Sequence, residues 1–193
     1  MKSNRWDDHY ARKARDEKWL ARSVYKLEEI DKKFNLLRRG DRVLDLGCTP
    51  GSWAQYSLSK VGPKGEVVGV DQNEPRHLSA PNFRFIQADV LTLDIEWLSG
   101  RIQWRDVVLS DLAPPTTGIR ERDERRSLEL GSRALDMARS LLKKKGRFVC
   151  KIFEGEDMDR FAESVFSAFK DTRRFRPKAT RKRSREVYIV ASK

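Results

Sequence analysis

Short runs of β-branched and other apolar residues alternate with longer amphipathic stretches along most of the chain. The runs that predict strands are Arg42–Cys48, Glu66–Asp71, Phe83–Asp89, Asp106–Asp111 and Arg147–Phe153. The stretches that predict helices are Ala21–Asn35, Ser52–Lys60, Ser127–Lys145 and Met158–Lys170. Alternation of this kind is typical of parallel strands joined by crossover helices. We therefore expect an α/β fold.

Two further strands are expected at the end of the chain, near Arg173–Pro177 and Glu186–Ala191. The link between them is too short for a helical crossover, so the last strand should run antiparallel to its neighbours. Residues 1–193 fit one domain, and we expect the polar residues 1–20 to be loosely held.

Composition narrows the class of protein. The chain has 193 residues, 38% of them hydrophobic, and no apolar run near the roughly 18 residues that a membrane span needs. Its charged beginning lacks the apolar region of a signal peptide. The two cysteines, Cys48 and Cys150, lack the paired spacing of a zinc site. We expect a soluble cytoplasmic protein, monomeric by default, with no membrane partner and no metal.

The charge of the chain points to a polyanionic partner. The net charge is +12, from 41 basic and 29 acidic residues. Nine basic residues face one acid between Lys170 and Arg185, and Arg139–Arg147 adds five basic residues with no acid. Because the middle of the chain is nearly balanced, the positive potential should concentrate on particular surfaces.

A glycine-containing turn, DLGCTPGSW, follows the first predicted strand. Gly47 and Gly51 allow a sharp turn and a close approach to a ligand, and the next helix begins at the same place. The spacing is not that of a dinucleotide motif, so a pyrophosphate cradle is not predicted. Trp53, in the first turn of the helix, should lie against this ligand loop.

Acidic residues end the next two predicted strands. Asp71 is placed to accept hydrogen bonds from ribose hydroxyls, and Asp89 to accept one from an adenine amino group. Carboxylates repel a phosphate chain but suit an adenosine ligand with a cationic centre. We therefore expect S-adenosyl-L-methionine as the cofactor, bound by Gly47, Gly51, Trp53, Asp71, Asp89 and Asp111.

A second group of charged residues is expected at the same edge of the sheet. Asp111 ends the fourth strand ahead of a rigid double proline, and Lys151 interrupts the apolar fifth strand, FVCKIF. A lysine buried there needs a carboxylate, an open cleft or a function for a neutral amine. Glu186 begins the antiparallel last strand, so it can reach the same edge.

Five ordered motifs carry a resemblance to a known family. They are ARSVYKL around Lys26, DLGCTPGSW, SDLAPP around Asp111, CKIFEG around Lys151 and SREVYIV around Glu186. Together they resemble the FtsJ/RrmJ family of RNA ribose 2′-O-methyltransferases. The resemblance implies a Rossmann-like methyltransferase fold with a mostly parallel seven-stranded sheet, an antiparallel last strand and helices on both faces. It also implies a catalytic tetrad of Lys26, Asp111, Lys151 and Glu186.

The resemblance also implies a reaction and a partner. It implies methylation of a ribose in RNA, most simply a uridine of large-subunit (23S-type) ribosomal RNA, with ribosomal RNA or the large ribosomal subunit as partner. Lys151 would be the base, or would stay charged and orient the hydroxyl. A methyltransferase of the tRNA anticodon loop and a non-catalytic RNA-binding assembly factor remain open alternatives. Pro115 and the pair Cys48-Thr49 depart from the usual family pattern.

Overall fold

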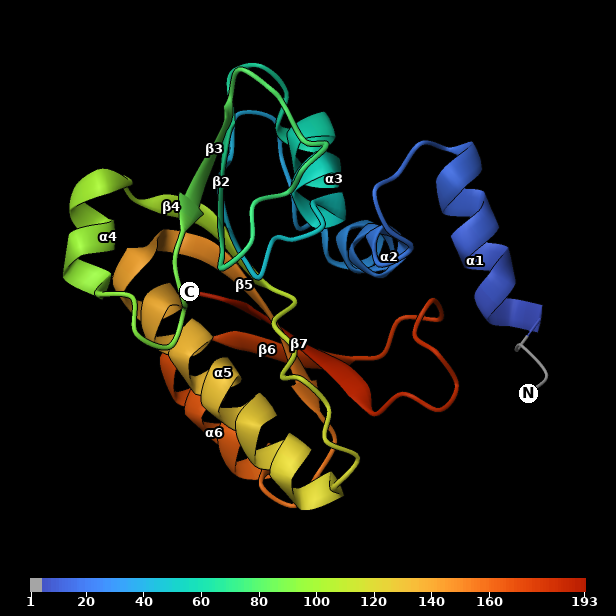
Figure 1. Ribbon diagram of the computed structural model, residues 1–193. Helices are drawn as coiled ribbons and strands as arrows, with labels where there is room; N and C mark the ends of the chain where they lie inside the picture. The colour runs from blue at the N-terminus through green and yellow to red at the C-terminus, as the bar shows by residue number, and fades with distance from the viewer. Residues whose placement is uncertain (1–4) are drawn as a thin grey trace.

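A seven-stranded sheet runs through the computed structural model, which describes residues 5–193, with side chains from residue 9 onward (Figure 1). The strands, given in their spatial order, are β3 (Phe83–Gln87), β2 (Glu66–Asp71), β1 (Arg42–Leu46), β4 (Arg105–Ser110), β5 (Leu142–Phe153), β7 (Glu186–Ser192) and β6 (Asp171–Phe175). Neighbouring strands from β3 to β5 pair in parallel, and β7 pairs antiparallel with both β5 and β6. The expected sheet is confirmed.

Helices cover both faces of the sheet (Figure 1). One face carries α1 (Arg5–Asp16), α2 (Val24–Phe34) and α3 (Ser52–Val61), and the other carries α4 (Ile95–Arg101), α5 (Arg120–Leu141) and α6 (Met158–Ala168). Each face has its own apolar core, because side chains alternate along each strand: Val43 packs with the first group of helices and Leu44 with the second. The two cores fix the sheet between the helical layers.

Three helices differ from the expectation. Residues 5–16 form α1, a helix that the sequence pattern does not predict, and its Tyr10 ring lies 5.3 Å from that of Tyr25 in α2. Residues 1–4 lie outside the described part, and the expectation that residues 1–20 are loosely held stays a prediction. The short helix α4 was not predicted, although its N-cap Asp94 accepts backbone hydrogen bonds in the usual way. The fifth helix starts earlier than Ser127, with Glu121 and Asp123 in its first turn, and ends at Leu141.

The early end of α5 has a structural cause. Leu142 already pairs with Arg105 of β4, and Lys145 and Gly146 exchange backbone hydrogen bonds with Lys193. Strand pairing therefore replaces the helical hydrogen bonds that a lysine-rich segment would otherwise make. Between residues 5 and 193, no helix is long and apolar enough to cross a membrane.

Candidate active site

An acidic cavity of about 740 Å³ opens at the carboxyl ends of the parallel strands. The residues singled out from the sequence that line it are Gly47, Asp71, Asp89 and Asp111. Its remaining walls come from the loop after β4, which includes Pro115, and from the first half of α5. The edge is where open parallel sheets place their ligands, because the strand ends and the loops that follow them meet there.

The two glycines of the turn after β1 have different surroundings. Gly47 has a φ of +77°, and a Cβ atom there would lie 2.8 Å from Leu112 Cδ2, so only glycine fits this cavity wall. Gly51 has a φ of +113° and begins α3, but it packs against Leu20 and does not line the cavity. Gly51 therefore shapes the turn that leads into α3, and its expected contact with the cofactor stays a prediction.

Local backbone hydrogen bonds hold two of the cavity carboxylates. Asp71 accepts from the Thr49 amide at 3.1 Å and from the Asn73 amide at 3.0 Å. Asp89 accepts from the Leu91 amide at 2.9 Å. A carboxylate has about four lone-pair sites, so each retains capacity to accept from a ligand. Both residues are half-buried, so part of each side chain remains open to a ligand in the cavity.

Asp45 lies behind the cavity wall and is fully buried. Neither of its carboxyl oxygens has a hydrogen-bond partner among the described residues. Burial, together with the charges of Asp111 and Asp71, raises its pKa to about 8. Because a buried charge without a partner is costly, the carboxyl group of Asp45 is mostly protonated near neutral pH.

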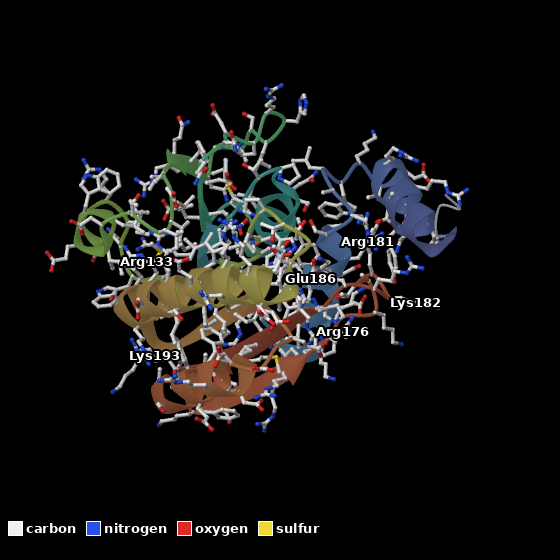
Figure 2. All side chains as sticks on the ribbon, turned by 60° about the horizontal axis from the view of Figure 1, so that its bottom comes forward. Arg133, Arg176, Arg181, Lys182, Glu186 and Lys193 are labelled. Atoms are coloured by element: carbon white, nitrogen blue, oxygen red, sulfur yellow. The ribbon has the colours of Figure 1, made fainter. Side chains whose placement is uncertain are left out.

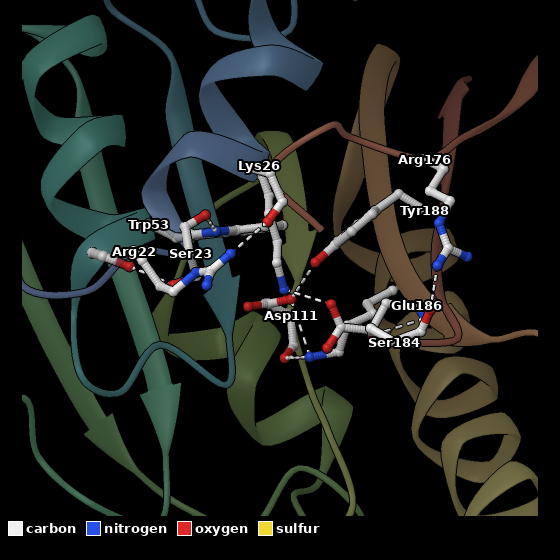
Figure 3. A network of polar contacts seen from close by, with 12 residues as sticks. Arg22, Ser23, Lys26, Trp53, Asp111, Arg176, Ser184, Glu186 and Tyr188 are labelled. Carbon is white, nitrogen blue, oxygen red and sulfur yellow. Dashed lines mark hydrogen bonds and ion pairs between the residues drawn. The ribbon is translucent and has the colours of Figure 1, made fainter. Parts of the chain in front are cut away.

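Beside the cavity, charged side chains from four elements form a lysine–carboxylate network, labelled in part in Figure 3. Lys151 Nζ lies 2.5 Å from the carbonyl oxygen of Asp111 and 3.1 Å from its Oδ1 atom. Lys26 Nζ, on α2, lies 2.5 Å from Oε2 of Glu186 at the start of β7. Lys151 is 5% exposed, so the lysine in the apolar strand is buried against a carboxylate.

Tyr188 joins the two lysine pairs. Its hydroxyl group donates to Asp111 Oδ1 at 2.8 Å, and its ring lies 6.0 Å from Lys26 Nζ (Figure 3). Tyr188 is a member of the site that was not predicted from the sequence. The strand period could have indicated Tyr188, because residues two apart in a strand point to the same face, and Tyr188 therefore lies beside Glu186.

The electrostatics of the network keep Asp111 ionised. Burial raises the pKa of Asp111, but the ammonium groups of Lys151 and Lys26 and the hydrogen bond from Tyr188 outweigh burial and leave this pKa below its usual value. Burial and the carboxylates of Asp111 and Glu186 raise the pKa of Tyr188 far above its usual value, so the hydroxyl remains a donor. The network therefore holds a fixed negative charge between two amines.

Trp53 contacts the network through Tyr188. Its indole nitrogen donates to the Ser23 carbonyl at 2.9 Å, and its ring centre is 5.8 Å from that of Tyr188. It is not among the residues that line the cavity, and its expected contact with the cofactor stays a prediction. This face of α3 packs against α2, so Trp53 supports the helix that carries Lys26.

No group of three His, Cys, Asp or Glu residues that could hold a metal ion occurs among the described residues. The free thiols, Cys48 and Cys150, are both buried. Burial raises the pKa of Cys150 to about 12, and that of Cys48 further still, so neither is a thiolate near neutral pH.

Comparison with known proteins identifies the family. A model of the FtsJ-like methyltransferase family matches residues 19–193. A protein of Bdellovibrio bacteriovorus named ribosomal RNA large subunit methyltransferase E is 47% identical over 186 residues, which cover 95% of this chain and 94% of the relative. A solved Plasmodium falciparum chain named as a ribosomal RNA methyltransferase is 27% identical with a TM-score of 0.79, covering 90% of this chain and 97% of that one.

A more distant structure shares the fold. Fibrillarin from Aeropyrum pernix, solved with bound S-adenosyl-L-methionine, has a TM-score of 0.57 at 18% identity and covers 81% of this chain and 68% of that one. The expected methyltransferase fold is thereby confirmed. With a family model that spans residues 19–193 and a relative at 47% identity, the chain belongs to the FtsJ-like methyltransferase family.

Proposed function

We propose that this protein transfers a methyl group from S-adenosyl-L-methionine to a ribose 2′-hydroxyl group of large-subunit ribosomal RNA. The observation that carries the proposal is the meeting of Lys26, Asp111, Lys151 and Glu186 beside the acidic cavity. Family membership supports the reaction class, and the name of the 47% identical relative supports the substrate.

The residues around the cavity fit this cofactor. Asp71 is placed to accept from ribose hydroxyls and Asp89 from an adenine amino group. The ionised Asp111, which lines the cavity, favours the positive charges of the methionine half. When bound, the cofactor supplies an electrophilic methyl group. Gly47 keeps the wall beside Leu112 open enough for a close approach.

Lys151 is the group that we assign to the hydroxyl nucleophile. Its Nζ atom already contacts two oxygens of Asp111, which fixes the amine at the mouth of the cavity. A neutral amine in this position accepts the hydroxyl proton, whereas a charged one donates to the developing alkoxide. Lys151 and Lys26 together lower the pKa of Asp111 against the effect of its burial, so the carboxylate that positions the amine is ionised.

The basic loop, defined here as residues 176–185, would bring the RNA to this site. It leads directly into Glu186, and Figure 2 shows Arg176, Arg181 and Lys182 on the same side of the molecule as Glu186. Lysine and arginine contacts to phosphates position a nucleic acid without reading its sequence. The choice of a uridine in 23S-type RNA is part of the proposal and rests on the family resemblance.

Methyl transfer from labelled cofactor to purified large-subunit RNA, to intact large subunits and to tRNA tests the proposal directly. We expect incorporation into the ribosomal substrates, mapped to a 2′-O-methylated uridine, and none with a Lys151→Ala variant. Incorporation into tRNA alone would contradict the substrate. Absence of incorporation into every RNA, from protein shown to bind the cofactor, would contradict the reaction.

A further inference from the structure

A lysine-rich bulge interrupts β5 at the edge of the sheet opposite the active site. Leu142 pairs with Arg105 and Arg147 pairs with Val107, so four residues of β5, Lys143–Gly146, lie opposite one residue of β4. Lys145 in this bulge has a φ of +62°, which is uncommon for a residue other than glycine. Bulges are built features of sheets rather than defects, and this one exposes consecutive lysines.

Hydrogen bonds connect the bulge to two neighbouring loops. Arg147, directly after the bulge, donates to the Leu36 carbonyl at 2.5 Å and to both carboxylate oxygens of Asp41. The Gly40 amide in turn donates to the Val61 carbonyl at 2.8 Å, next to the turn before β2. The bulge and the segments before β1 and β2 therefore form one continuous surface.

Five exposed cations project from this surface. They are Arg38, Arg39, Lys64, Lys144 and Lys145, which we call the opposite-edge surface. None of these side chains forms an ion pair or side-chain hydrogen bond with residues 9–193.

Nearby acids cannot neutralise the opposite-edge surface, because they are already engaged. Asp41 pairs with Arg147, and Asp106 pairs with Lys143 and accepts from the Arg42 amide. A surface with five cations and no free carboxylate in its loops strongly favours a polyanion.

The opposite-edge surface is separate from the basic loop. The strand from Arg147 to Phe153 spans roughly 20 Å at about 3.3 Å per residue, and the active site lies at its far end. In Figure 2, Lys193, which bonds to the bulge, lies at the other end of the molecule from Arg181 and Lys182. A short RNA held at the active site does not reach both surfaces.

We propose that the opposite-edge surface binds the phosphate backbone of a second segment of the RNA substrate, so that a large folded RNA is held at both edges of the sheet. This inference rests on the proposed function, because it assumes an RNA substrate at the active site. Neither surface reads sequence; each contributes electrostatic affinity that depends on salt.

A charge-removal series tests the inference. The variant carries Gln at all five positions, and the matched control keeps the charge with Lys64→Arg, Lys144→Arg, Lys145→Arg, Arg38→Lys and Arg39→Lys. The probes are transcribed 23S-type ribosomal RNA and a short RNA hairpin, each titrated over a range of salt. The double variants Arg38→Gln/Arg39→Gln and Lys144→Gln/Lys145→Gln are measured alongside, in case the fivefold variant fails to fold.

We expect the charge-removed variants to bind the long RNA about tenfold or more weakly at moderate salt, with a salt slope shallower by about one for each lost contact. Hairpin and cofactor affinity should not change, and the charge-retaining control should match the wild type. Equal losses of affinity for the long RNA and the hairpin, or a loss of affinity in the charge-retaining control, would overturn this inference but not the proposed function. Polyglutamate serves as an additional probe. If the charge-removed variants lost affinity for polyglutamate but kept their affinity for RNA, the inference would be overturned in favour of an acidic polypeptide partner. Wild-type protein that binds neither RNA would overturn the proposed function.

Discussion

The acidic cavity and the lysine–carboxylate network lie side by side but are assembled differently. In the cavity, Asp71 and Asp89 each accept from the backbone amide two residues further on, and Asp71 also accepts from the amide of Thr49, 22 positions away. In the network, Lys26 and Glu186 are 160 positions apart, and Tyr188 is 77 positions from Asp111. The hydrogen bonds that hold the cavity carboxylates therefore span short stretches of chain, whereas those of the network join distant parts of the sequence.

This difference predicts that the two regions can be damaged separately. Loss of a network residue should remove catalysis while the cavity keeps its shape, because no cavity carboxylate other than Asp111 depends on the network for its hydrogen bonds. Asp111 is the shared residue, since it lines the cavity and also contacts Lys151.

The largest effect is expected from Lys151→Met, which keeps the apolar stem and removes the amine. Methyl transfer should fall by about 10²–10⁴-fold, the usual contribution of a positioned acid or base. Cofactor affinity should stay within about twofold of the wild-type value, since the backbone amides that hold Asp71 and Asp89 remain in place. Single-turnover methyl transfer and calorimetric cofactor titration separate the two quantities. Near-normal turnover would remove Lys151 from the chemistry, and a parallel loss of cofactor binding would show that the two regions are not separable.

Asp45→Asn tests the cavity side through stability. The pKa of Asp45 is raised to about 8 when folded, so between its unfolded value near 4 and about 8 the folded state keeps a proton that the unfolded state has released. Wild-type stability should therefore fall as the pH rises through this window. The variant lacks this titration and should be more stable than the wild type by about a few kcal/mol near pH 8, with the difference shrinking toward pH 4.

Urea unfolding of both proteins across this range measures the free-energy difference for Asp45→Asn. A difference that does not change with pH would contradict the assignment, because amide packing alone does not titrate.

Tyr188→Phe should have a smaller effect, which falls on the pH dependence of catalysis. The hydrogen bond to Asp111 Oδ1 lowers the pKa of Asp111, so its removal should raise that pKa and shift the acidic limb of the rate profile upward. We expect kcat/KM to fall by about tenfold, as for the loss of one hydrogen bond to a charged group. Tyr56→Phe is the matched control, because Tyr56 donates to buried Asp31 at 2.9 Å. If the pH–rate profile of Tyr188→Phe were unshifted, Tyr188 would have no role in setting the pKa of Asp111.

The same contrast explains which parts could be predicted from the sequence. Asp71, Asp89 and Asp111 were predicted at one edge because parallel strands end together, and Glu186 joined them because an antiparallel strand begins there. Lys26 was placed only by the family resemblance, since the position of α2 depends on packing of side chains distant in sequence.

Two local features could not be predicted because they depend on tertiary contacts. The ring of Trp53 is held against Ser23 and Tyr188 by the packing of α3 on α2. The segment Lys143–Lys145 was expected to extend a helix, since lysine favours helices, but pairing with β4 and with Lys193 holds it in a bulge. Neither contact can be predicted from neighbouring residues, because each joins segments that are distant in the sequence.

The smallest effect is expected where the network meets the basic loop. Glu29, on the helix that carries Lys26, accepts from the amides of Lys178 and Ala179 at 2.6 and 2.9 Å, and Arg22 donates to the Ala179 carbonyl. One helix thus fixes both a catalytic amine and the backbone of the loop that is proposed to bind RNA. Glu29→Gln removes the charge and one of the two acceptors, which loosens the loop without touching the cavity.

We expect Glu29→Gln to raise the KM for RNA by about threefold to tenfold, the cost of roughly one net hydrogen bond, while kcat and cofactor affinity change by less than twofold. Glu28→Gln is the matched control and should leave all three quantities unchanged, because among residues 9–193 the side chain of Glu28 bonds only to exposed Lys32 on the same helix. Steady-state methyl transfer with varied RNA measures the split. If kcat fell together with the affinity for RNA, the tether would also set the geometry of Lys26, and substrate binding and catalysis would be linked through α2 rather than independent.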